Sequence, residues 1–326
     1  MAQLLYETIV KIGTINEPKG KPEPQFALPS TVNWMKALAI LTESHEMTFG
    51  KAIDCYHRVQ RWDPTDLMVN SIYEQLFLSL HHLSALEQLS KAQISADFAR
   101  LGIIGWYYGL SNAAKAMIVA QSGAWKEDHA SVARIWDSEI AATENALPPF
   151  NWRISSLVKT EIARQVDSYR SGNTFPLTKK PSTTAEAMGA SAAYLSGTAE
   201  WYSWQIQEKV KESSDFKKLG VDSFRSSEAK KLRDENLTRR SIGFLHQAMR
   251  YRGKANYREA LFLAYGPTTE THLTGFMAAQ AKVLRSFLTM AGAFSSRRIG
   301  RERWNCFLED VDKNRAFTTS ASSVWT

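Results

Sequence analysis

The sequence has few cysteines, the residues that form disulfide frameworks and many zinc sites. It contains two cysteines, Cys55 and Cys306, which lie far apart in the chain and have no partner at the spacing of a zinc motif. No glycine-rich phosphate loop and no internal repeat is present. These absences exclude a disulfide-stapled secreted domain and a P-loop enzyme, and they favour a reducing compartment and no bound cofactor or metal.

Long hydrophobic runs are also missing. No segment reaches the roughly 18 consecutive apolar residues of a membrane span, and the N-terminus, with acidic Glu7, does not follow the order of a signal peptide. We therefore expect a cytoplasmic protein without a membrane partner. At 326 residues and 44% hydrophobic content, the chain can bury one large core or two smaller ones.

Positive charge is present and is concentrated in one segment. The whole chain carries a net charge of +7, and residues 209–258 alone hold 14 basic against 6 acidic residues, a net charge of +8. Two interpretations of this basic segment remain open, a solvated helix surface or a binding site for phosphate and nucleic acid.

The hydrophobic periodicity predicts a mainly α-helical fold. Residues 1–30 contain four prolines and are expected to form an extended arm. A long helix is predicted from Leu67, after the capping residues Asp63 to Asp66. Another is predicted over 96–122, ended by Gly123. Its inward residues are expected to be Phe98, Leu101, Ile104, Tyr108 and Met117.

The second half of the chain is expected to be helical after a loop. Residues 31–170 are predicted as a first helical region, 171–184 as a linker or long loop because Gly, Pro, Ser and Thr dominate them, and 185–326 as a basic helical region that packs on the first. Within the last region, 227–249 reads as one helix. A short β segment is predicted near 150–160, where apolar residues alternate.

The stretch from Ile104 to Val132 resembles a known family. It places Trp106-Tyr107-Tyr108-Gly109-Leu110 before Ala113-Ala114-Lys115-Ala116, and then His129-Ala130-Ser131-Val132. This pattern resembles the central helix pair of HEPN-like proteins, with the YaaC-like bacterial family as the closest variant. The residues themselves indicate a core helix whose small side chains allow close helix packing. The resemblance implies an antiparallel helical bundle, frequent dimerisation and, in active members, a metal-independent ribonuclease.

Active HEPN members use an Arg followed after four to six residues by a His, and this sequence contains that pattern. Arg239 and Arg240 both stand at the required spacing from His246, inside the basic segment. On one helix, Arg239 and His246 would share a face, whereas Arg240 would point elsewhere. Imidazole could move the 2′-hydroxyl proton while guanidinium holds the phosphate. About one such match is expected by chance in a chain of this composition.

Downstream, cations alternate with tyrosines in a pattern suited to single-stranded nucleic acid, with a turn between helices as the alternative. The residues are Arg250, Tyr251, Arg252, Lys254, Tyr257 and Arg258. We therefore predict a nucleic-acid-binding HEPN-like subunit that binds RNA or DNA, forms homo- or hetero-oligomers, and belongs to a bacterial defence or toxin-type protein complex. The alternative is an endoribonuclease that uses His246 with Arg239 or Arg240.

Overall fold

A computed structural model describes Thr8, Ile12 and residues 24–256, 258–266 and 268–326. Most of these residues are helical, which confirms the prediction of a mainly α-helical fold. The described residues contain no strand; the β segment expected near 150–160 consists of one isolated bridge between Ile154 and Ile242. No helix in these ranges is both long and apolar enough to cross a membrane.

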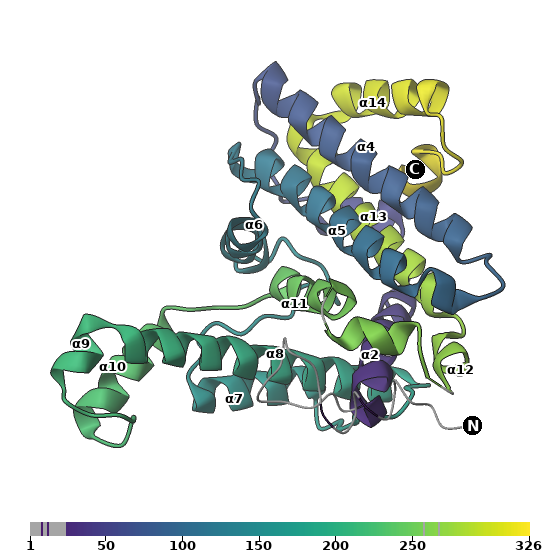
Figure 1. The fold of residues 1–326 in the computed structure, drawn as a ribbon. Helices are drawn as coiled ribbons and strands as arrows, with labels where there is room; N and C mark the ends of the chain where they lie inside the picture. The colour runs from purple at the N-terminus through teal and green to yellow at the C-terminus, as the bar shows by residue number, and fades with distance from the viewer. Residues whose placement is uncertain (1–7, 9–11, 13–23, 257, 267) are drawn as a thin grey trace.

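Three long helices form the centre of the molecule (Figure 1): α4 (Asp66–Leu89), α5 (Ala99–Ser122) and α13 (Phe276–Ile299). The α4 and α5 helices are antiparallel and joined by a short connection. A Cβ at Gly109 of α5 would lie 2.6 Å from Leu284 Cδ2 of α13. The small residues of α5 therefore permit the close helix packing that the sequence indicates.

The two predicted long helices have the expected ends. The Thr65 hydroxyl accepts a hydrogen bond from Met68 N at the start of α4, and Gly123, with φ of 73°, ends α5. The predicted inward face of α5 is partly wrong, because Leu101 is 60% exposed and Tyr108 is also exposed. The fully buried aromatic residue is Trp106 instead.

A second layer packs against the central helices through α2 (Pro24–Ser44) and α11 (Phe244–Asn256). It extends to α8 (Thr184–Glu212) and then to α7 (Lys159–Arg170), which packs on α8 (Figure 1). Trp34 of α2 stacks on Tyr194 of α8, with ring centroids 4.0 Å apart, and meets Trp106 edge-on at 5.9 Å. One hydrophobic core therefore continues from the central helices into the second layer, across the loop at 171–183.

Shorter helices complete the fold: α3 (Phe49–Cys55), α6 (His129–Trp136), α9 (Ser214–Lys218), α10 (Ser227–Thr238), α12 (Thr269–Leu273), α14 (Arg301–Asn314) and α15 (Ser322–Trp325). The α9 and α10 helices lie at the far end of α8, away from the central helices (Figure 1). Phe216 of α9 and Ala229 of α10 form a small separate hydrophobic cluster with Val210 of α8.

Two predicted segments differ from the structure. Residues 24–30 belong to α2 rather than to an extended arm, since Pro24 is the first helical residue, where no backbone N–H is needed. The rest of the arm, apart from Thr8 and Ile12, lies outside the described residues. The single helix predicted over 227–249 is two helices, α10 and α11, separated by residues 239–243.

An arginine of α13 joins three parts of the chain. Arg298 donates hydrogen bonds to the carbonyl oxygens of Ala120, Gln121 and Gln60 at 2.8, 2.8 and 2.7 Å. The first two belong to the last turn of α5, where carbonyls lack partners within the helix. The guanidinium also lies 5.3 Å from the centre of the Trp62 ring. Arg298 therefore acts as the C-terminal cap of α5.

Candidate functional site

A basic cleft lies where α6, α8 and α10 approach the start of α11. It encloses about 630 Å³. Its lining includes four cationic side chains from three parts of the chain and one acidic side chain: Arg134, Lys209, Arg239, Arg240 and Asp215. The four cations are all exposed. The cleft therefore combines open access with an excess of positive charge.

Aromatic side chains form part of the cleft wall. Trp201 and Tyr202, neighbours on α8, both line it and meet edge-on with ring centroids 4.8 Å apart. The guanidinium of Arg250 lies 5.9 Å from the centre of the Trp201 ring. Cations next to partly accessible aromatic rings can bind phosphates and stack against bases at the same time.

The segment between α10 and α11 brings the Arg and His residues of the sequence motif together. Arg239 ends α10, and His246 lies in the first turn of α11, so the prediction that they share one helix face is wrong. Ile242 exchanges two backbone hydrogen bonds with Ile154, of 2.8 and 2.9 Å, and this pairing replaces helical structure. As a result Arg239, Arg240 and His246 all line the cleft, including the arginine expected to point elsewhere.

A buried carboxylate holds this segment in place. Asp137 is 1% exposed and begins the π-helical segment η2 (Asp137–Ala141) that follows α6. It accepts two hydrogen bonds from Arg153, of 3.2 and 3.1 Å, and one from the Ser241 hydroxyl of 2.6 Å. A Cβ at Gly243 would lie 2.5 Å from Asp137 Oδ1. The Asp137 carboxylate thus fixes the residues on both sides of Ile242.

His246 forms part of the cleft floor and is only 8% exposed. Its Nδ1 accepts a hydrogen bond of 3.1 Å from the Gly243 backbone N–H, so the neutral ring carries its proton on Nε2. The ring meets Tyr202 edge-on at 5.5 Å. Burial lowers the pKa of His246 to about 4, although the nearby Asp137 acts in the opposite direction. His246 is therefore a neutral hydrogen-bond donor near pH 7.

The residues predicted to bind nucleic acid do not form one surface. Tyr251 is wrong as a contact residue: it is 0% exposed, and its hydroxyl donates to the Thr31 carbonyl at 3.0 Å, because this face of α11 packs against α2. Lys254 Nζ donates to the Ser30 and Thr31 hydroxyls at 3.2 and 3.3 Å.

The other members of that set have separate positions. Arg250 donates to the Thr198 hydroxyl at 3.3 Å and lies beside the cleft wall. Arg252 is half-buried against the Tyr107 ring, 4.9 Å from its centre. Tyr257 and the side chain of Arg258 lie outside the described part of the structure.

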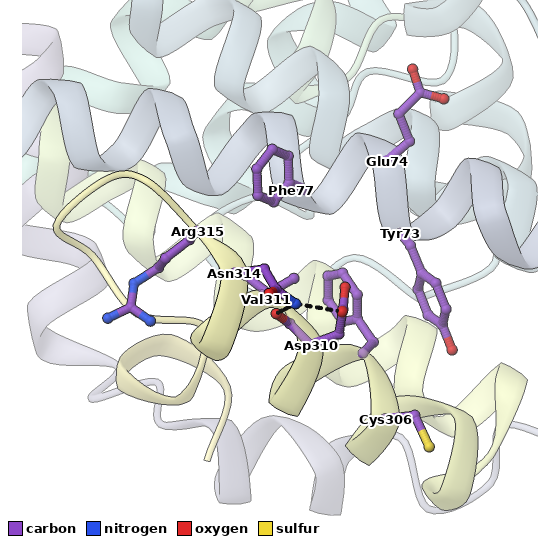
Figure 2. Close-up of a pocket in the computed structure, with 9 residues that line it drawn as sticks. Tyr73, Glu74, Phe77, Cys306, Asp310, Val311, Asn314 and Arg315 are labelled. Atoms are coloured by element: carbon purple, nitrogen blue, oxygen red, sulfur yellow. Dashed lines mark hydrogen bonds between the residues drawn. The ribbon is translucent and has the colours of Figure 1, made fainter.

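A second hollow differs in chemistry. A groove of about 540 Å³ lies between α4 and α14, and Phe307 is among its lining residues. Figure 2 shows Phe77 and Tyr73 of α4 on one side of it and Val311 of α14 on the other. Tyr73 stacks on Phe307 at 4.6 Å. The lining has one basic side chain, Arg315, against two acidic ones, so this groove lacks the cationic character of the cleft.

Sequence reasoning found Arg239, Arg240 and His246 but missed Asp137, Arg134 and Lys209 as parts of the same site. Within the described ranges, no group of three or more His, Cys, Asp or Glu residues is placed to hold a metal ion. In comparisons with known proteins, no family model, curated protein or solved structure matches the chain.

Proposed function

We propose that the basic cleft binds nucleic acid, RNA or DNA, through its phosphates. The observation that carries the proposal is the convergence of Arg134, Lys209, Arg239 and Arg240 on one cleft with two aromatic rings in its wall. Phosphate contacts by Lys and Arg supply most of non-specific nucleic-acid affinity. Aromatic side chains add stacking that tolerates any base.

The state of His246 favours binding over cleavage. A general base needs a free nitrogen lone pair, but Nδ1 already accepts the Gly243 N–H and Nε2 holds the ring proton. A general acid near neutral pH needs a protonated ring, and burial lowers the pKa of His246 to about 4. His246 is better suited to donate a hydrogen bond from Nε2 to a bound phosphate or base.

The HEPN-like parentage is part of the same proposal. The stretch that resembles HEPN proteins forms α5 and α6, and α6 supplies Arg134 to the cleft. A catalytically silent HEPN-like subunit that holds nucleic acid within a multiprotein complex accounts for these features. The association state of the purified chain, and the proteins that copurify with it, test this part independently.

Fluorescence anisotropy with labelled single-stranded RNA and DNA, measured between about 50 and 200 mM salt, tests binding. The double variant Arg239→Gln/Arg240→Gln should lower affinity and reduce the salt slope by about 1.4, the value for two single-strand phosphate contacts. The control variant Arg58→Gln/Lys313→Gln removes the same charge from exposed positions on other elements.

Equal affinity losses in the two double variants, or binding without salt dependence, would contradict the proposal. The endoribonuclease alternative is tested on the same RNA in EDTA. Cleavage by the wild type that is lost in His246→Ala would support catalysis, and intact RNA would support binding alone.

A further inference from the structure

Beside the cleft, Arg252 has no acidic partner among the described side chains. Its guanidinium lies over the Tyr107 ring, and its Nε is buried with no hydrogen-bond partner in the described part of the structure. No carboxylate among the described side chains forms an ion pair with Arg252. Partly buried charges in proteins are normally paired, because removing them from water is costly. Within the described residues, no negative charge therefore balances Arg252.

The surroundings of Arg252 are aromatic and cationic. His129 meets the Tyr107 and Tyr108 rings edge-on, at 5.1 and 5.5 Å, and its Nδ1 is also buried without a partner. Tyr108 is 37% exposed. Burial, Arg252 and Lys115 all lower the pKa of His129, while Asp128 acts against them.

Among the described residues, the carboxylate that acts on the pKa of His129 is Asp128, and it already accepts a hydrogen bond. Asp128 caps α6 by accepting the backbone N–H of Ser131 at 2.8 Å. The cluster of Arg252, Tyr107, Tyr108 and His129 therefore has an excess of donors and positive charge.

This cluster continues the cleft along two helices. On α6, His129 directly precedes Ala130 and Ser131, which line the cleft. On α11, Arg252 follows Met249, another lining residue, by three positions. The six residues from His246 to Arg252 correspond to about 9 Å along a helix axis. That distance spans two to three stacked nucleotides at about 3.4 Å each.

We infer that Arg252, with Tyr107, Tyr108 and His129, forms a second phosphate subsite, which a single-stranded nucleic acid reaches when it extends beyond the basic cleft. The inference rests on the proposed function of the cleft. Arg252 contacts a phosphate, and the exposed Tyr108 ring supports the adjoining base. An oligonucleotide short enough to fill only the cleft does not reach Arg252.

The test compares a dinucleotide-length and a longer single-stranded oligonucleotide on wild type and Arg252→Gln. We expect about a tenfold loss of affinity for the longer oligonucleotide, with a salt slope reduced by about 0.7, and no change for the short one. Arg252→Lys should recover most of the slope, because it keeps the charge. Arg164→Gln, an exposed position on α7, is the charge control.

The possible failures are distinguishable. If wild type binds neither oligonucleotide, the proposed function of the cleft fails. If both bind and Arg252→Gln changes neither, or changes both equally with an unaltered Tm, the second subsite is overturned. A change that Arg252→Lys does not rescue overturns the phosphate contact.

Discussion

The Asp137 network offers a direct test of how the cleft is held together. Its carboxylate is almost fully buried, while the paired Arg153 side chain is 23% exposed. Breaking a buried ion pair costs about 3–5 kcal/mol, and the partial exposure of Arg153 places Asp137→Asn at the lower end, about 3 kcal/mol. Asp137→Ala also removes the acceptor of Ser241, which adds about 1 kcal/mol.

The assay is urea unfolding followed by circular dichroism. The expected order of destabilisation is Asp137→Ala, then Asp137→Asn, then Ser241→Ala at about 2 kcal/mol. Glu161→Gln is the control, because its ion pair with Arg164 at 2.7 Å is exposed and contributes about 0.5 kcal/mol or less.

Replacing both partners, in Asp137→Leu/Arg153→Met, should restore much of the loss, since no unpaired buried charge remains. An Asp137→Asn protein within about 0.5 kcal/mol of wild type would refute the reasoning. So would a Glu161→Gln variant that is equally destabilised.

Three further predictions concern other residues. Gly243→Ala should lower stability by about 2 kcal/mol, seen as a lower Tm, because the added Cβ would lie 2.5 Å from the fixed Asp137 Oδ1. Arg298→Met should cost about 3 kcal/mol in urea unfolding. Arg298→Lys should cost less than Arg298→Met, because an ammonium still donates hydrogen bonds, although from one nitrogen instead of three separate ones; equal stability of all three proteins would contradict the cap. For His246, the pKa is lowered on folding from 6.5 to about 4. The stability that this shift contributes is therefore fully present above pH 6.5 and falls by about 3 kcal/mol as the pH drops from 6.5 to 4. The urea midpoints of His246→Asn should lack this part of the acid dependence.

The sequence predicted the helices well where local signals define them. Thr65 and Gly123 mark helix ends through their own side-chain and backbone preferences, and both positions are correct. The inward face of α5 was harder, because apolar residues occur on most sides of this helix and Leu101 and Trp106 are equally plausible core residues.

The candidate site was only partly predictable because its geometry depends on distant contacts. Residues 227–249 have a helical pattern, and distant contacts interrupt it: the pairing of Ile242 with Ile154 and the hydrogen bond of Ser241 to Asp137. Local sequence does not show that Asp137 meets Ser241, or that Tyr251 faces α2 rather than solvent. The Arg-to-His spacing nevertheless identified three residues that the fold brings to one cleft.

The α9 and α10 helices lie at the far end of α8, away from the central helices (Figure 1). They pack with the end of α8 on a small cluster around Phe216, whereas the central helices pack on the main core. One wall of the cleft, with Lys209 in the last turn of α8 and Arg239 after α10, lies at this end of α8. A slight bend of α8 beyond Trp201 would alter the width of the cleft, while Ala187, Ala190 and Tyr194 nearer the start of this helix remain in the main core.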